Sequence, residues 1–352
     1  MNIESNEKLK YELFIKRYSR LIIGILALAI FFTSYWLWFD FRSFLKEPIQ
    51  FSSQDQVLTI KKGTGVNRLV NQLYTKKIIT KPLYFKILSF IKPEYKKLKV
   101  GEYLLGARMT PDQLLTQLSQ GIVIQYSFTI IEGQTWHEII QNLAKEERLS
   151  ALESSAHADL ISALNIDSVN LEGWLFPETY YFTKGDTALS VLTRASQSMI
   201  TTLKEEWSNR SANLPYQSAY EALIMASIIE KETGVPYERA EIAGVFVRRL
   251  QKKMRLQTDP TVIYGIGPDF NGDITRRDLK TPTAYNTYVI KGLPPTPIAM
   301  PSRESIHAAL HPKSGSTLYF VADGSGGHYF SETLQEHQQA VNRMLKRNRE
   351  AN

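Results

Sequence analysis

The sequence predicts an α+β protein with three parts: an N-terminal membrane-spanning helix, a small domain in which two strands flank two helices, and a larger, mainly helical domain with short β segments. Three observations support this prediction. One uncharged apolar run lies near the N-terminus, strand-like and helix-like patterns alternate up to residue 130, and long helical patterns dominate from about residue 187. The length of 352 residues suits two or three folded units.

The composition excludes several classes of protein. The chain has 42 Lys and Arg against 35 Asp and Glu, six His and no Cys, and 43% of its residues are apolar. The apolar content supports packed cores, and the lack of Cys excludes disulfides, thiolate zinc sites and a Cys nucleophile. The net charge of +7 favours an acidic partner, which on charge alone includes nucleic acid, anionic lipid and an anionic polymer.

Residues 21–39 form an uncharged apolar run of nineteen residues, interrupted only by Thr33 and Ser34. As a helix this run would reach roughly 28 Å, close to the hydrocarbon thickness of a bilayer. Aromatic residues cluster at its end, as in an interfacial belt. We therefore predict a single membrane span at 21–39.

The charges around this run predict its orientation. Basic residues precede it at positions 8, 10, 16, 17 and 20, whereas Arg42 and Lys46 stand among Asp40 and Glu47 after it. Residues 1–20 are therefore expected in the cytoplasm and the bulk of the chain outside it, which argues against a nucleic-acid partner. A cleaved signal peptide is disfavoured, because the run is longer than a typical h-region and no small-x-small site follows it.

A linker at 40–56 and a small domain at 57–130 are predicted next. Thr110 is a plausible N-cap for a helix that ends at Gly121. A strand expected at 123–130 would complete the small sheet. The other patterns of this domain are strand-like at 57–61, helical at 66–74 and 82–91, and strand-like at 100–105.

The remaining chain is predicted as a connecting helical region at 131–170 and the larger domain at 171–347. LEGWLFPETYYF at 171–182 places five aromatic residues in twelve positions. The turn-rich segments after residue 255 are expected to surround a site. Helices are predicted at 136–147, 187–207, 218–233, 236–252 and 331–347.

A candidate general acid follows the apolar run LIMASII at 223–229, because desolvation keeps a carboxyl group protonated near neutral pH. Glu230 comes directly after this run, and Glu232 is its rival. The two side chains are separated by roughly 200° on a helix, so one of them is expected to be essential. Glu230 is favoured because it shares a face with the small residues Ala226 and Ser227.

Other residues leave alternatives open. Asp259 precedes Pro260 and suits a turn, a sugar-hydroxyl contact or the positioning of Glu230. Glu172 and Glu178 flank the aromatic cluster as carbohydrate contacts or buried hydrogen-bond anchors. His307 and His311 have the i, i+4 spacing of two metal ligands, although a partly exposed pair is favoured. DGSGGH at 323–328 is typical of a hairpin turn, with His328 able to face a cleft.

Five blocks of the sequence resemble the endolytic murein transglycosylases known as MltG or YceG-like proteins. These blocks are ASIIEKETG, RLQTDPTVIYG, TAYNTY, KGLPP and YFVADGSGGHYF, with LEGWLFPETYYF upstream, and the match covers roughly residues 50–345. The resemblance implies a single-pass inner-membrane protein with its N-terminus in the cytoplasm. Its periplasmic part would join a small LysM-like domain at 57–130 to a catalytic domain that cuts glycan strands.

The family pattern assigns roles to individual residues. Its catalytic acid carries onto Glu230. The resemblance implies cleft residues at Gln257, Thr258, Asp259, Tyr285, Asn286, Thr287 and Tyr288, to which we add His328. The chain departs from the frequent GLPPGPIANPG pattern at Thr296, Met300 and Ser302, and from the frequent Asn at Arg248.

The implied reaction is endolytic cleavage of the MurNAc–GlcNAc bond in nascent peptidoglycan, which leaves 1,6-anhydroMurNAc ends. Glu230 would act first as general acid and then as base, with no metal or organic cofactor. Penicillin-binding peptidoglycan synthases are possible partners. Two other readings remain: a non-catalytic murein-binding anchor that recruits synthases, and a muramidase in which Asp259 or Glu172 is a second carboxylate.

Overall fold

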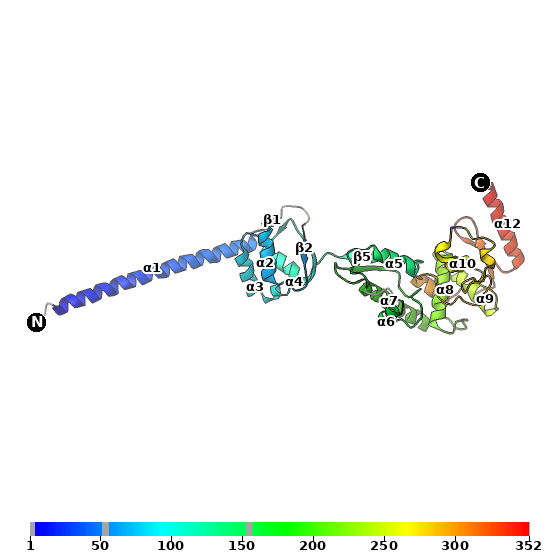
Figure 1. Cartoon of the computed structure of the whole chain (residues 1–352), viewed down its shortest axis with the longest axis horizontal. Helices are drawn as coiled ribbons and strands as arrows, with labels where there is room; N and C mark the ends of the chain where they lie inside the picture. The colour runs from blue at the N-terminus through cyan, green and yellow to red at the C-terminus, as the bar shows by residue number, and fades with distance from the viewer. Residues whose placement is uncertain (1–3, 51–55, 153–156, 352) are drawn as a thin grey trace. The chain divides into compact units, whose positions relative to one another are not determined.

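A computed structural model of the chain describes residues 4–50, 56–152 and 157–351 (Figure 1). Contacts divide the chain into a first unit that ends at Ile124 and a second unit that begins at Gln125. The described residues form helices and four two-stranded antiparallel sheets. The predicted class of helices mixed with short strands is therefore confirmed.

Helix α1 (Glu4–Lys46) contains the predicted membrane span. Its part from Leu13 to Lys46 is long and apolar enough to cross a membrane, and its apolar window is fully exposed. The helix runs through the first part of the predicted linker, because Phe44 is buried in the core of the first unit. Residues 51–55 of that linker lie outside the described residues.

The first unit has the predicted order of strand, helix, helix and strand. Strand β2 pairs antiparallel with β3, with Leu58 opposite Tyr103. Thr110 caps α4 at its N-terminus, and Gly121 ends it in the left-handed conformation at φ 76°, as predicted. The likeness to LysM domains stays a prediction. The elements are β1 (Ile49–Gln50), β2 (Gln56–Ile60), α2 (Val66–Thr75), α3 (Pro82–Ile91), η1 (Pro93–Lys96), β3 (Gly101–Leu105), β4 (Arg108–Met109) and α4 (Pro111–Gln120).

The expectation that residues 123–130 complete the small sheet is wrong. Strand β5 (Tyr126–Thr129) instead pairs antiparallel with β6 (Thr179–Phe182) in the second unit. The reason is burial, because Phe128 and Ile130 pack into the core of the second unit. The start of the segment does reach the first unit, where the Ile124 N–H donates to Glu102 O at 2.7 Å.

Helices α5 (Trp136–Ala144) and α6 (His157–Ala163) occupy the region predicted to connect the two domains. Trp136, Ile139 and Leu160 are buried in the same core as the rest of the second unit. This region therefore packs as part of that unit.

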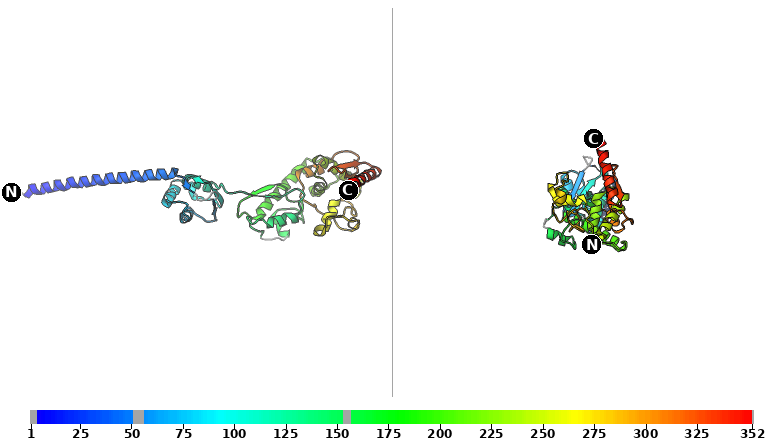
Figure 2. Two further views of the ribbon diagram at one scale, coloured as in Figure 1. Left: turned by 90° about the horizontal axis from the view of Figure 1, so that it is seen from above. Right: turned by 90° about the vertical axis from the view of Figure 1, so that its right-hand side faces the viewer.

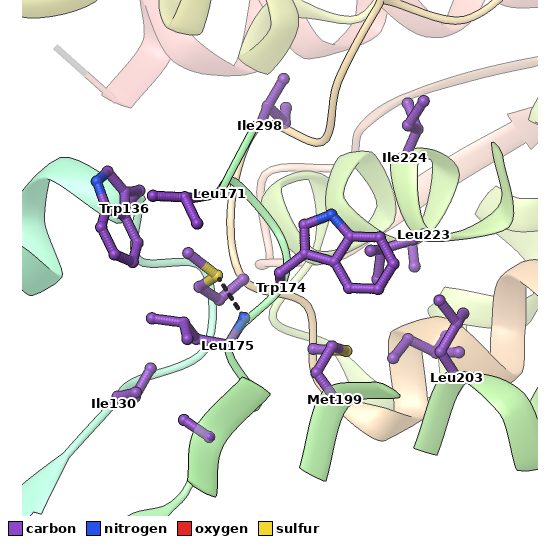
Figure 3. Close-up of a cluster of buried hydrophobic side chains, with 14 of the residues drawn as sticks. Ile130, Trp136, Leu171, Trp174, Leu175, Met199, Leu203, Leu223, Ile224 and Ile298 are labelled. Atoms are coloured by element: carbon purple, nitrogen blue, oxygen red, sulfur yellow. Dashed lines mark hydrogen bonds between the residues drawn. The ribbon is translucent and has the colours of Figure 1, made fainter. Parts of the chain in front are cut away.

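The second unit is built around α8 (Ala219–Glu232), in which every residue from Ala222 to Ile229 is buried. Its neighbours are α7, α9, α10 and α11. Figure 3 shows part of this core, with Trp174 beside Leu223. The predicted helices correspond to α5, α7 (Ala188–Ser208), α8, α9 (Arg239–Gln251) and α12 (Leu334–Ala351). Helix α6 lies in the predicted helical region at 131–170, α11 (Arg303–Leu310) carries the helical spacing of His307 and His311, and the structure adds α10 (Asp259–Ile266).

Short helical turns and one hairpin shape the rest of the second unit. Strands β7 (Tyr319–Ala322) and β8 (His328–Ser331) pair antiparallel around the DGSGGH turn, which confirms the hairpin reading. Figure 2 shows this hairpin beside α12. Three 3-10 turns, η2 (Pro236–Glu238), η3 (Gly267–Asp269) and η4 (Asp278–Lys280), lie in the connections.

Candidate functional site

The last turn of α8 carries the three charged residues Glu230, Lys231 and Glu232. Consecutive residues of a helix are separated by about 100°, so these side chains leave the helix in different directions. The described contacts show that each one reaches a different segment of the second unit.

Glu230 is attached to the start of α11. Its Oε2 accepts hydrogen bonds from the Ser302 N–H at 2.8 Å and from the Ser302 hydroxyl. Its Oε1 lies 3.8 Å from Nη2 of Arg239, and its side chain is 7% exposed. Two donors from Ser302 and the Arg239 guanidinium thus surround this carboxylate.

Lys231 is attached to the loop before α5. Its Nζ donates to the Gly133 carbonyl at 3.2 Å. That loop is also paired with the segment before α11, because Gly133 N–H donates to Met300 O and Met300 N–H donates to Gln134 O, both at 2.8 Å. The loop before α5 and the segment before α11 therefore pack together against the last turn of α8.

Glu232 faces the start of α10. Its Oε1 accepts a hydrogen bond from the Thr258 hydroxyl. The pKa of Glu232 is raised to about 7. Burial is the main cause and the negative charge of Asp259 adds to it, while Thr258, His328 and Arg249 act in the opposite direction. A carboxyl group with this pKa holds a proton over part of the neutral range, which is the property required of a general acid.

The two sequence blocks predicted to form the cleft meet beside Glu232. The Thr258 N–H donates to Thr287 Oγ1 at 3.0 Å. The Tyr288 hydroxyl donates to Asp259 Oδ1 at 2.6 Å. Gln257 is exposed, with φ 51°, and its N–H donates to Thr287 O at 3.2 Å. The exposed Asp259 and the half-buried Tyr288 thus lie on the Glu232 side of the helix, next to the exposed Gln257 in the chain.

Asn286 and Tyr285 make mainly structural contacts. The Asn286 amide donates to Asp278 O at 2.9 Å and to Thr281 O at 2.7 Å, and the side chain is buried. The Tyr285 hydroxyl shares a 2.9 Å hydrogen bond with Thr296 Oγ1. A substrate contact for either residue stays a prediction.

His328 is held by Glu238. Its backbone N–H donates to Glu238 Oε1 at 2.8 Å, and its Nδ1 lies 2.7 Å from Glu238 Oε2. The ring packs against Phe320 at a centroid distance of 5.3 Å. His328 is also near enough to act electrostatically on Glu232, so it belongs to the same polar cluster.

Comparisons with known proteins assign the chain to a family. The family model described as "YceG-like family" matches residues 58–343. This chain belongs to the YceG-like family. It is 32% identical to an endolytic murein transglycosylase of Bacillus subtilis, over 86% of the chain and 88% of that protein. It is 29% identical to an endolytic murein transglycosylase of Streptococcus pneumoniae, over 84% of the chain but 59% of that longer protein.

A solved structure supports the same assignment. The YceG-like protein of Listeria monocytogenes, determined at 2.6 Å, is 31% identical to this chain, with a TM-score of 0.52. The match covers 82% of this chain and 99% of that one. The likeness therefore extends well beyond the site motifs.

Positions at which this YceG-like chain departs from the frequent pattern have defined contacts. Ser302 adds the hydroxyl that donates to Glu230. Met300 is fully buried, and its sulfur accepts from the Leu175 N–H at 3.4 Å, the bond drawn in Figure 3. Arg248 Nε donates to Thr317 O, in the segment before β7, at 2.7 Å. The departure at 302 thus changes the surroundings of Glu230, whereas the one at 300 lies in the core beside Leu175.

Glu172 is a buried anchor in this YceG-like fold. Its Oε1 accepts from the Trp136 N–H at 2.9 Å, and its Oε2 accepts from the Tyr264 hydroxyl at 3.0 Å. Burial raises the pKa of Glu172 to about 7. Glu178, by contrast, is exposed. The anchor alternative for Glu172 is the one that the contacts favour.

The rings of His307 in α11 and of His311, its C-cap, stack with centroids 4.2 Å apart. Their ligand atoms and that of Glu206 lie within 4.8 Å of one another, close enough for one metal ion. However, Glu206 already pairs with Arg303 Nε at 2.9 Å, and a guanidinium on that carboxylate competes with a cation. The prediction that the YceG-like site needs no metal stays a prediction.

Sequence reasoning missed three residues that position this site. Arg239 and Ser302 approach Glu230, and Arg249 acts on Glu232. Arg249 is buried and donates to Leu256 O and Leu318 O, both at 2.6 Å. The only sequence signal among them is Ser302, which stands where many YceG-like proteins have Gly.

Proposed function

We propose that this chain is an endolytic murein transglycosylase that cleaves the MurNAc–GlcNAc bond within glycan strands and leaves 1,6-anhydroMurNAc ends. Membership of the YceG-like family and two relatives named for this activity support the proposal. The chain is accordingly an enzyme that acts on peptidoglycan, rather than a non-catalytic anchor.

The general acid in this proposal is Glu232. One observation carries the assignment: burial raises the pKa of Glu232 to about 7 beside the Thr258, Asp259 and Tyr288 cluster. Protonated Glu232 would give its proton to the glycosidic oxygen while the bond to the anomeric carbon breaks. The C6 hydroxyl of MurNAc attacks that carbon, and the ionised carboxylate accepts the hydroxyl proton. No water is consumed.

Glu230, chosen from the sequence and the family motif, is the competing assignment. Its carboxylate is occupied by contacts with Ser302 and Arg239, whereas Glu232 lies beside the cluster of Thr258, Asp259 and Tyr288. In our proposal Glu230 holds the start of α11 in place, and Glu232 performs the proton transfers.

The test compares Glu232→Gln and Glu230→Gln in the purified full chain on isolated sacculi. Removal of a general acid typically lowers the rate by about 10²–10⁴-fold, and Glu232→Gln is expected in this range. Glu230→Gln is expected to retain substantially more activity at the same amount of folded protein. The reverse order of the two variants would assign the chemistry to Glu230.

A muramidase is the second candidate, because Asp259 is a carboxylate close enough to affect Glu232. Hydrolysis requires a second carboxylate as nucleophile or base. Mass spectrometry of the released fragments separates the two reactions, since hydrolysed ends carry one water that anhydro ends lack. Anhydro ends alone support the transglycosylase; hydrated ends support the muramidase.

The proposed location follows from α1. The apolar helix anchors the chain in the inner membrane, with residues 1–20 in the cytoplasm and the two folded units on the periplasmic side. Nascent glycan strands, made by penicillin-binding synthases at the same membrane, would then be within reach of the site.

A further inference from the structure

One face of α3 exposes apolar side chains to solvent. The exposed fractions are 63% for Leu83, 37% for Ile87, 76% for Phe90 and 58% for Ile91. These positions are spaced i, i+4, i+7 and i+8, so they share one side of the helix. The opposite side is buried in the first unit through Phe85 and Leu88. A contiguous exposed apolar face of this kind marks an interaction site.

Contacts with α1 place this helix at the end of the membrane span. Asp40 Oδ1 accepts from Lys81 Nζ and Asp40 Oδ2 from the Tyr84 hydroxyl, both at 2.7 Å. The Phe44 ring packs against Tyr84 at 5.4 Å and against Phe85 at 5.2 Å. Asp40 is the residue that follows the predicted span, and Figure 1 shows α3 beside that end of α1 and running across it.

Basic side chains surround the apolar face. Lys96 Nζ lies 5.3 Å from the centroid of the Phe90 ring. Lys96 and Lys97 are exposed after α3, and Arg42 and Lys46 are exposed at the end of α1. Glu47 and Glu94 are the exposed acids in these two segments, so positive charge predominates. Basic residues beside an apolar helix face are typical of helices that lie in the interface of anionic membranes.

We propose that α3 lies in the membrane interface, with Leu83, Ile87, Phe90 and Ile91 inserted among the lipids and the neighbouring lysines on anionic headgroups. The occupant is a bilayer because α3 is attached to the same helix that crosses it. If the membrane span were the only contact with the bilayer, the first unit could rotate about the axis of α1. A second contact through α3 fixes the orientation of that unit against the membrane.

The absence of Cys from the chain makes the proposal directly testable. Phe90→Cys and Ile87→Cys each introduce a single thiol at an exposed position, where a spin label can be attached. The control is Val57→Cys, 48% exposed on β2, which Figure 1 shows on the side of the first unit away from α1. Each labelled full-length chain is reconstituted into vesicles that contain anionic lipid.

The experiment compares how often the spin label collides with oxygen, which concentrates in lipid, and with a nickel chelate, which stays in water. Labels at 87 and 90 are expected to favour oxygen several-fold more than the label at 57. If they are as accessible to nickel as the control, the helix stands in water and the proposal is wrong. Shielding from both reagents would also overturn it, because a protein partner would then cover the face.

Discussion

The assignment of Glu232 predicts the pH dependence of the reaction. With a pKa of about 7, Glu232 is half protonated at pH 7 and roughly one-tenth protonated at pH 8. The general acid acts only when protonated, so kcat/KM should fall about fivefold from pH 7 to pH 8 and about tenfold from pH 8 to pH 9. This decline defines an alkaline limb whose midpoint reports the pKa of the acid in the free enzyme.

Two neighbouring substitutions should move this midpoint in opposite directions. Thr258→Val removes the hydroxyl that donates to ionised Glu232, so the pKa and the midpoint should rise by about one unit. Asp259→Asn removes a negative charge that disfavours ionisation, so the midpoint should fall, by roughly half a unit to one unit. The Asn carbonyl can still accept from the Tyr288 hydroxyl, which limits the disturbance.

The assay is release of anhydromuropeptides from sacculi between pH 5 and 9, at substrate levels that report kcat/KM. Both variants should first be shown to unfold at the same denaturant concentration as the parent chain. Opposite shifts identify Glu232 as the titrating acid, because the two substitutions act on it through different interactions. Shifts in the same direction, or an unmoved midpoint in both variants, would refute the reasoning.

Two further predictions concern stability. The pKa of Glu172 is raised from 4.5 to about 7, so the stability it contributes is present at low pH and is lost as pH rises through 7. The unfolding free energy of Glu172→Gln, relative to that of the parent, should therefore increase by about 3 kcal/mol between pH 5 and pH 8. Denaturant titration at the two pH values measures this difference, and a difference that does not change with pH would contradict the prediction. Gly173 has φ +83°, and an added Cβ would lie 2.6 Å from the Pro297 side chain. Gly173→Ala should cost about 2–4 kcal/mol, whereas Gly185→Ala, at φ +95° with open space around it, should cost about 1 kcal/mol; equal losses would show that the clash is relieved.

Local sequence patterns correctly predicted the elements that are determined by residues close to one another in the sequence. The apolar run at 21–39 lies within α1, and the uncharged run at 223–229 lies in α8, where every residue from Ala222 to Ile229 is buried. Thr110 and Gly121 set the ends of α4 as expected. These features depend on interactions between residues within a few helical turns of each other, so a short stretch of sequence is enough to predict them.

Features that depend on distant segments were harder to predict. The strand at 126–129 has an alternating pattern that either sheet could accept, and its partner lies about fifty residues later. The choice between Glu230 and Glu232 has the same origin. The apolar run predicts that a carboxyl leaves a buried helix, but the start of α10 covers Glu232 and the start of α11 supplies donors to Glu230.

The last turn of α8 joins three segments, and this affects how any mutation there is interpreted. Glu230 holds Ser302, Lys231 holds Gly133, and Glu232 receives Thr258. Loss of Glu230 would free the start of α11 and could shift the turn that positions Glu232, so a partial loss of activity in Glu230→Gln fits either assignment. The alkaline limb separates them. If Glu230 only positions Glu232, then Glu230→Gln lowers the rate, and Thr258→Val and Asp259→Asn still shift the midpoint of the alkaline limb in opposite directions. If Glu230 is the general acid, neither Thr258→Val nor Asp259→Asn moves that midpoint.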